Sequence, residues 1–111
     1  MPTLYVTAPP GAAADLAATL VEERLVACVN RVPCRSTYRW DGEVHADEPE
    51  EVLLAKTTDG RAAEAEARIA ALHPYETPCI ERFEEAAVAD PFAEWIADAT
   101  GAADASGSGE E

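Results

Sequence analysis

The chain has 111 residues, 48% of them hydrophobic, and its 22 acidic against 8 basic side chains give a formal net charge of −14. This length predicts one domain with a modest core, and no apolar run reaches the roughly 18 residues that a membrane-spanning helix needs. The strong negative charge argues against nucleic-acid binding, which requires cationic side chains to neutralise phosphates.

The first predicted elements are a strand and a helix. Thr3–Thr7 is rich in β-branched and aromatic residues, which favours a strand, and Pro9-Pro10-Gly11 ends it. Apolar residues then recur at helical spacing through Asp15–Arg24. We therefore expect a first helix over this segment, with a buried side that includes Leu16, Leu20 and Val21.

A long hairpin is predicted next. Leu25–Trp40 reads as a strand with a bulge or bend at Pro33, because proline cannot donate to the hydrogen-bond ladder. Asp41-Gly42 is typical of a two-residue type I′ turn, in which both central residues have positive φ. The return strand starts at Glu43, is disturbed over Asp47–Pro49 and runs clearly to Thr57. We expect the distal half of this hairpin to leave the parent sheet.

The second half of the chain predicts helix, strand and helix. Thr58 or Asp59 caps a helix over Arg61–Leu72, and Pro74 ends it. Cys79–Phe83 follows as a strand. The pair Asp90-Pro91 opens a last helix that Gly101 ends. The predicted buried residues of these two helices are Ala62, Ala65, Ile69 and Leu72 in the first, and Phe92, Trp95, Ile96 and Ala99 in the second.

The predicted order is β-α-β-β-α-β-α, which favours an α+β, ferredoxin-like domain with an extra C-terminal helix and a long hairpin. We assign residues 1–101 to this domain. Residues 102–111 lack an apolar anchor and are predicted to be a disordered acidic tail. A hairpin longer than its sheet leaves unpaired edge groups, so we also expect the chain to form an oligomer.

Composition also bears on the cellular setting. The acidic residues are spread along the whole chain and Lys56 is the only lysine, which favours a halophilic cytoplasm of molar salt, where the Debye length is about 3 Å. The alternative is an acidic surface that binds a partner. Cys28, Cys34 and Cys79 are an odd number without a C-x-x-C pair, which predicts free thiols in a reducing cytoplasm. Met1–Pro10 shows no secretory signal.

The segment His73–Cys79, here called the connector, gathers an imidazole, a phenol, a carboxylate and a thiol. Pro74 and Pro78 fix their own φ angles and keep His73 and Thr77 out of helical conformation. The connector is therefore predicted to be stiff and extended, so that its side chains have defined directions.

Four motifs stand in order along the chain: Arg24–Asn30 (RLVACVN), Tyr38–Glu43 (YRWDGE), Leu54–Thr58 (LAKTT) and Leu72–Pro78 (LHPYETP). Together they resemble the CutA divalent-cation tolerance family over Leu4–Thr100, which is the whole domain without its tail. The resemblance implies a ferredoxin-like subunit, a tightly interlocked homotrimer, a cytoplasmic setting and an association with copper and other divalent metals. The fold also resembles the trimeric P-II signalling proteins, which bind small effectors in clefts between subunits.

Two candidate sites follow from the residues and this resemblance. For a metal we consider His73 and Cys79, since an imidazole and a thiolate suit copper or zinc. The alternatives are a histidine bonded to a carbonyl and a buried, apolar cysteine. The chain departs from the family in two places. Cys79 stands where relatives usually have Glu, and Val6 and Thr7 lie on the first strand where a cysteine ligand has been placed.

The second candidate is a cleft at a subunit interface for a small anionic ligand or effector, made of Trp40, Lys56, His73, Tyr75 and Glu76. A lone lysine within an apolar strand needs a partner, because burying an unpaired ammonium is costly. The alternative is a Lys–Glu pair between subunits with the aromatic residues as interface packing.

Two other groups of charged residues lie on the hairpin. His45 near the turn, among Glu43, Asp47 and Glu48, is expected to belong to a solvated acidic tip, with weak binding of hard cations as the alternative. Arg31, Arg35 and Arg39 are expected to meet acidic residues of a neighbouring subunit.

Three functions remain open from the sequence. The first is a cytoplasmic homotrimer that binds copper or another divalent cation and takes part in the response to metal ions. The second is a P-II-like small-molecule or partner sensor that uses the cleft between subunits. The third is a stable trimeric scaffold without a ligand site. We expect no enzyme, because the sequence has no phosphate-binding glycine-rich loop, nucleophile elbow or metal triad.

Overall fold

The fold is described from a computed structural model that places residues 1–101; the predicted tail lies outside these described residues. Seven elements follow the predicted order: β1 (Pro2–Ala8), α1 (Pro10–Glu22), β2 (Cys28–Trp40), β3 (Glu43–Lys56), α2 (Asp59–Leu72), β4 (Ile80–Glu84) and α3 (Asp90–Thr100). Within residues 1–101, no helix is long and apolar enough to cross a membrane.

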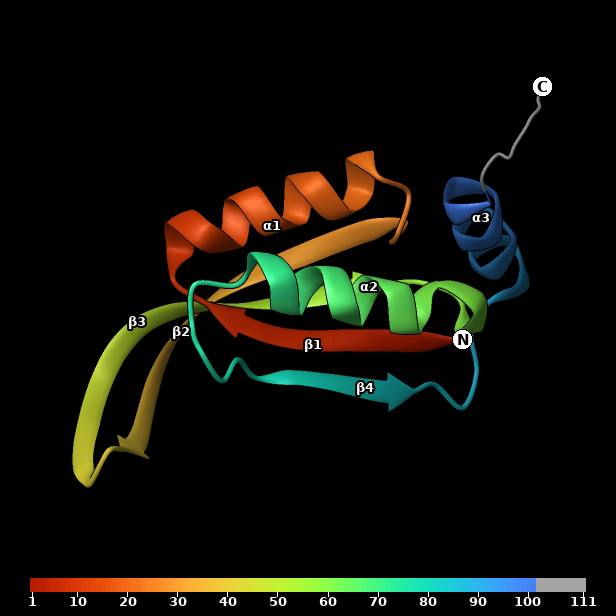
Figure 1. The fold of residues 1–111 in the computed structure, drawn as a ribbon. Helices are drawn as coiled ribbons and strands as arrows, with labels where there is room; N and C mark the ends of the chain where they lie inside the picture. The colour runs from red at the N-terminus through yellow and green to blue at the C-terminus, as the bar shows by residue number, and fades with distance from the viewer. Residues whose placement is uncertain (102–111) are drawn as a thin grey trace.

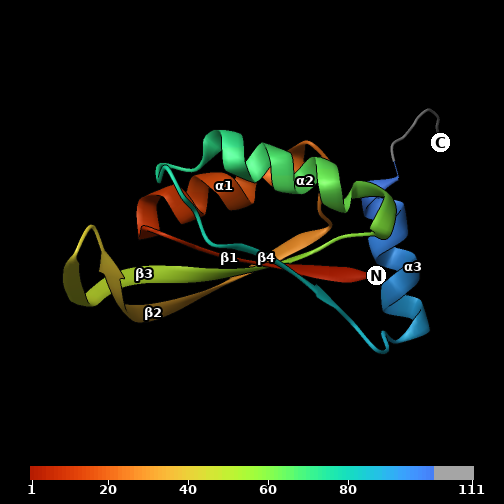
Figure 2. The ribbon, with the colours of Figure 1, turned by 60° about the horizontal axis from the view of Figure 1, so that its bottom comes forward.

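The strands form one antiparallel sheet in the order β2-β3-β1-β4, and α1 and α2 cover one of its faces (Figures 1 and 2). This confirms the α+β, ferredoxin-like arrangement. The core lies between the helices and this face. Alternate residues of β1 and β3 point into it and meet the apolar side of each helix, because side chains alternate between the two faces of a strand. Its members include Leu4, Val6, Leu16, Leu20, Leu53, Ala55, Ala65 and Ile69.

The first helix begins earlier than predicted, at Pro10 rather than Asp15. Proline is tolerated at the first helical position, because the missing N–H would have no partner there and its fixed φ suits the helix. At the other end, Arg24 adopts a left-handed φ of 59°, and the N–H of Leu25 donates to the carbonyl of Leu20 at 3.0 Å. The chain thereby leaves the helix and enters β2.

The hairpin follows the prediction at the turn but not at Pro33. Asp41 and Gly42 have φ of 57° and 81°, as a type I′ turn requires. Pro33 stays in register opposite Glu51 without a bulge. Its missing N–H does not matter because β2 is an edge strand.

The predicted disturbance on the return strand is confirmed at Asp47. The register slips between Ser36 and Tyr38, so that β3 holds an extra residue there, and Asp47 has a left-handed φ of 59°. Its N–H donates to Oγ1 of Thr37 at 3.2 Å, and Arg35 donates to its carbonyl at 3.1 Å. The bulge is thus held by side chains of the opposite strand.

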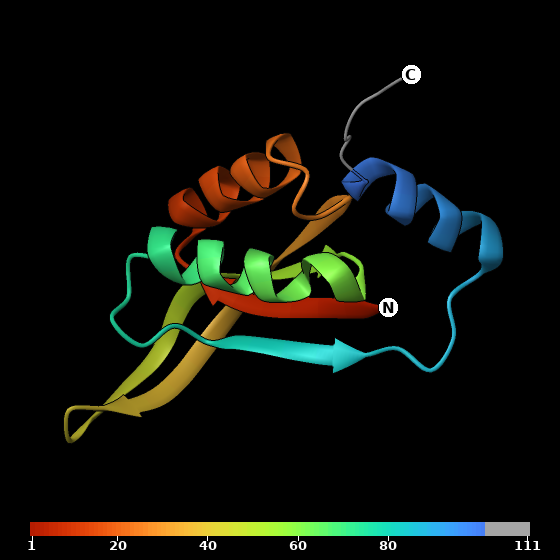
Figure 3. The same ribbon diagram turned by 45° about the vertical axis from the view of Figure 1, so that its right-hand side comes forward.

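The distal half of the hairpin leaves the sheet, as predicted. β1 pairs with β3 only from Lys56 to Glu51, whereas β2 and β3 stay paired as far as Trp40 and Glu43. In Figures 1 and 3 this part curves away from the helices and projects beyond the sheet.

Four apolar residues predicted to be buried are exposed, and the first of them is Val21 on α1, which is 40% exposed. Leu72 is 40% exposed because α2 has already passed the edge of the core at its last residue. Phe92 and Trp95 stack on one another at 5.7 Å between ring centroids but remain 41% and 48% exposed. Of the predicted face of α3, only Ile96 is fully buried.

Substitutions in α2 test this core. Ile69→Ala is expected to lower the free energy of unfolding by about 2–5 kcal/mol, because it leaves a cavity where the side chain is 1% exposed. Leu72→Ala, three residues along the same helix, removes an exposed side chain and should cost well under half of that. Chemical denaturation of both variants measures the difference, and equal losses would contradict the described orientation of α2.

Candidate functional site

The connector His73–Cys79 joins α2 to β4. The helix ends at Leu72, and His73 is extended, with φ −69° and ψ 139°, because the following proline disfavours helical angles. The N–H of His73 still donates to the carbonyl of Ile69 at 2.9 Å and closes the last helical turn. The imidazole therefore leaves the helix at a fixed point above the end of β1.

Both ring nitrogens of His73 are engaged. The N–H of Tyr75 donates to Nδ1 at 3.1 Å, so Nδ1 is the acceptor and the proton lies on Nε2 in the neutral ring. Nε2 then donates to the carbonyl of Thr7 at 2.8 Å. His73 is 8% exposed, and the centroid of its ring lies 4.9 Å from that of Tyr75. His73 thus ties the connector to β1.

Tyr75 carries a second link, to β3. Its hydroxyl donates to Oε2 of Glu50 at 2.8 Å, and Glu50 is only 7% exposed. Burial, together with the hydrogen bond to this carboxylate, raises the pKa of Tyr75 well above its usual value. The phenol therefore stays protonated and remains a donor to Glu50 at physiological pH.

A pocket of about 580 Å³ opens between the connector and the distal half of the hairpin. Such a volume is typical of small-molecule sites. Aromatic rings form much of its wall, and Tyr38 and His45 stack across the hairpin at 5.2 Å. The pocket is lined by Thr7, Ser36, Tyr38, Arg39, Trp40, His45, Glu50, Tyr75, Glu76, Thr77 and Cys79.

The structure brings together part of the predicted cleft. Trp40, Tyr75 and Glu76 line the pocket, and His73 supports Tyr75 without lining it. Lys56 does not belong to this group within one chain. It lies at the far end of β3, six positions beyond Glu50, or about 20 Å along a strand.

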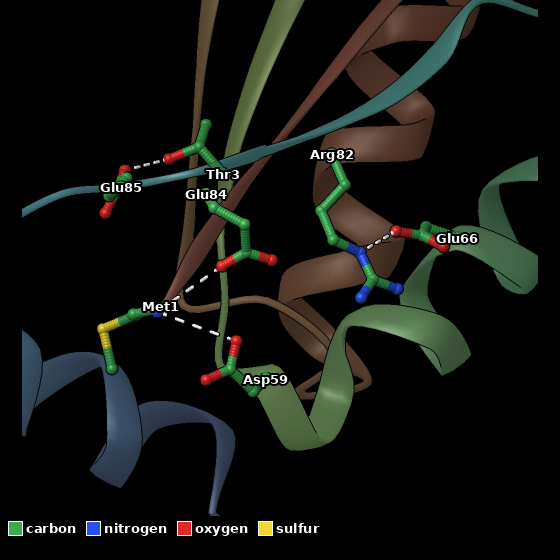
Figure 4. A network of polar contacts seen from close by, with 7 residues as sticks. All are labelled: Met1, Thr3, Asp59, Glu66, Arg82, Glu84 and Glu85. Atoms are coloured by element: carbon green, nitrogen blue, oxygen red, sulfur yellow. Dashed lines mark hydrogen bonds and ion pairs between the residues drawn. The ribbon is translucent and has the colours of Figure 1, made fainter.

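Lys56 has partners of its own. Its ammonium donates to Oγ1 of Thr3 at 3.3 Å and lies 3.6 Å from a carboxylate oxygen of Glu85. Thr3 in turn donates to Glu85, as Figure 4 shows. Nearby, the N-terminal ammonium lies within 4.0 Å of Asp59 and Glu84 (Figure 4). The lysine thus takes part in anchoring the segment after β4 to β1.

The two predicted metal ligands lie near the same residue of β1. His73 bonds the carbonyl of Thr7, while Cys79 lines the pocket beside it. Burial raises the pKa of the Cys79 thiol, against a smaller opposing effect of hydrogen bonding with Thr7. Among residues 1–101, no group of three His, Cys, Asp or Glu side chains is placed to hold a metal ion.

The arginines of the outgoing strand are mostly paired within the hairpin. Arg31 lies 3.2 Å from Glu51, and Arg35 lies 3.9 Å from Asp47. Arg39 lines the pocket but makes no hydrogen bond or ion pair with any residue of the described part of the chain. His45 is not only part of an acidic tip, since it stacks on Tyr38.

Glu50 is the main pocket residue that the sequence prediction missed. A signal was available, because Glu50 precedes Val52 and Leu54 at a spacing of two and so shares their face of β3. A carboxylate in such a series needs a donor when it is buried. Tyr38 was also missed, although it stands two residues before Trp40 on the same strand.

Comparison with known proteins agrees with the fold and these motifs. Residues 3–99 match the family model described as CutA1 divalent ion tolerance protein. The chain is 44% identical over 90 residues to the divalent-cation tolerance protein CutA of Thermus thermophilus, covering 80% of this chain and 86% of the relative. It is 35% identical over 94 residues to that of Archaeoglobus fulgidus, covering 84% and 91%.

Among solved structures, the PII-like protein CutA from Nostoc in apo form superposes with a TM-score of 0.86 at 34% identity, covering 90% of this chain and 97% of the other. Sequence and structure therefore agree over nearly all of the described residues. The chain belongs to the CutA1 divalent ion tolerance protein family.

Proposed function

We propose that this protein is a homotrimer that binds copper or another divalent cation and takes part in the response to metal ions. The observation that carries the proposal is family membership over residues 3–99, since the relatives from Thermus thermophilus and Archaeoglobus fulgidus are named divalent-cation tolerance proteins. The structure adds support for the oligomer and limits where the ion can be held.

Support for the oligomer comes from the sheet face opposite the helices. Leu4 and Val6 point into the core, so Tyr5 and Thr7 point to the other face. Phe83 stacks on Tyr5 there at 5.5 Å between ring centroids and is 47% exposed, as is Val32. An apolar sheet face without a helical layer favours burial against other copies.

Support for a metal site is centred on Cys79. Both nitrogens of His73 are engaged, so ligation there would cost a bond that holds the connector. Cys79 offers a soft ligand of the kind that copper and zinc prefer. Because residues 1–101 of one chain hold no ligand trio, we propose that neighbouring protomers complete the coordination.

We further propose a cytoplasmic, non-catalytic role. Cys28, Cys34 and Cys79 are free, which suits a reducing compartment, although one solved relative is named periplasmic and other relatives are named chloroplastic. Burial raises the pKa of Cys79 and so disfavours the thiolate that a nucleophile requires.

The pocket favours a second candidate function, a P-II-like sensor of a small molecule or partner. Its volume of about 580 Å³ and its aromatic wall suit an organic ligand better than a bare ion. The solved Nostoc relative carries the description PII-like in its name.

The trimer is tested by mass. Light scattering in buffered high salt should return three times the mass of the chain. Phe83→Asp or Val32→Asp, on the helix-free face, should shift the protein towards the monomer, because a charge is then buried in the contact. Val21→Asp, on the exposed side of α1, is the matched control and should leave the mass unchanged. A monomeric wild type would refute the trimer.

The metal site is tested by anaerobic titration with copper(I) or Zn²⁺. Cys79→Ser should abolish tight binding, and Cys28→Ser, which removes another partly buried thiol, should preserve it. Because the pKa of Cys79 is raised, binding must displace a proton, and affinity should increase about tenfold per pH unit until the thiol ionises. Unchanged affinity in Cys79→Ser would show that the ion lies elsewhere.

A further inference from the structure

The charge at the base of the pocket is negative. Glu50 is 7% exposed and accepts one hydrogen bond within the described part of the chain, from the Tyr75 hydroxyl to Oε2. Its second oxygen, Oε1, makes no hydrogen bond to these residues and is not fully buried, so it is open to a ligand. A buried carboxylate with free accepting capacity favours a ligand that donates hydrogen bonds and carries positive charge.

The side walls of the pocket are aromatic. Tyr38 and Trp40 stand two apart on β2 and therefore project to the same face, and His45 stacks on Tyr38 from β3. Tyr75 supplies another ring from the connector. The faces of such rings carry partial negative charge and attract cations.

The single arginine of the pocket, Arg39, does not outweigh the negative charge of Glu50 and of the aromatic ring faces. Arg39 lies between Tyr38 and Trp40, so its side chain starts from the opposite face of β2. It is exposed, and solvent screens its charge more than that of the buried Glu50. Glu76 adds a second carboxylate to the lining.

We propose that the pocket binds a small organic cation, a guanidinium or alkylammonium compound, with its charged end on Glu50 and its body between Tyr38, Trp40 and Tyr75. This inference rests on the second candidate function, the sensor, and names its ligand class. It differs from the expected anionic ligand, for which Lys56 is the anchor, because within one chain Lys56 lies at the other end of β3 with Glu85. Cys79 lines the same pocket, so the organic cation and a metal at Cys79 are distinguished by their separate titrations.

The test uses butylguanidinium as the probe and N-butylurea as its neutral isostere. The chain has two tryptophans, so a Trp95→Phe background leaves Trp40 as the fluorescent reporter inside the pocket. At fixed ionic strength, butylguanidinium should change this fluorescence saturably. Butylurea should bind at least about tenfold more weakly, since it lacks the charge that strengthens the hydrogen bond to Glu50.

Two pocket variants and one control sharpen the test. Glu50→Gln should weaken butylguanidinium binding by about tenfold or more. Tyr38→Leu removes an exposed ring that the core does not need and should weaken it about two- to fivefold. Glu94→Gln, an exposed charge change on α3 outside the pocket, should leave it unchanged.

Three outcomes overturn the proposal. Equal binding of butylguanidinium, butylurea and butyrate would leave a small-molecule pocket but refute its cation selectivity. No binding of any probe would refute the sensor as well, whereas copper titration of the same sample would still report on the metal proposal. In the third outcome, the wild type fails to bind butylguanidinium, whereas Arg39→Gln binds it and loses the trimer mass. In that case the pocket is filled by Arg39 of a neighbouring copy rather than by a free ligand.

Discussion

The neutral imidazole of His73 holds the arrangement on which the candidate site depends. Nδ1 accepts from the backbone of Tyr75 within the connector and Nε2 donates to the backbone of Thr7, so one ring orders the connector and ties it to β1. With the connector fixed, Tyr75 reaches Glu50 on β3, and the pocket lies between these elements and the hairpin. His73 therefore has a structural role in this chain, and neither of its nitrogens is free to bind a metal without breaking a hydrogen bond.

Most of the fold could be predicted from local patterns, because the turn, the breaks and the apolar periodicities all point to the same arrangement. The misses have physical causes. Pro10 is predicted only as part of the break after the first strand, although proline suits a first helical position. Pro33 was expected to bend its strand, but an edge strand tolerates proline where the nitrogen faces away from the neighbouring strand. Edge position is a property of sheet order, which residue patterns alone do not reveal.

The site was harder to predict than the fold. The motifs predict a shared site for Trp40, Tyr75 and Glu76, which line one pocket, whereas Lys56 lies at the other end of its strand within one chain. Motifs give the order of residues along the chain, whereas a pocket depends on which ends of the strands meet. Glu50 was overlooked because one glutamate does not stand out among 22 acidic residues unless its register with the apolar positions is considered.

The bulge at Asp47 and the loss of pairing with β1 have a consequence for local stability. One wall of the pocket is the connector, tied to the core, and the other is a two-stranded ribbon that receives no support from the rest of the sheet. Two-stranded ribbons in water are only marginally stable by themselves. In an isolated chain the ribbon should therefore open by local unfolding far more readily than the core, with fast amide exchange. Assembly or ligand binding then completes the folding of that wall, so occupancy and order in the ribbon are thermodynamically linked.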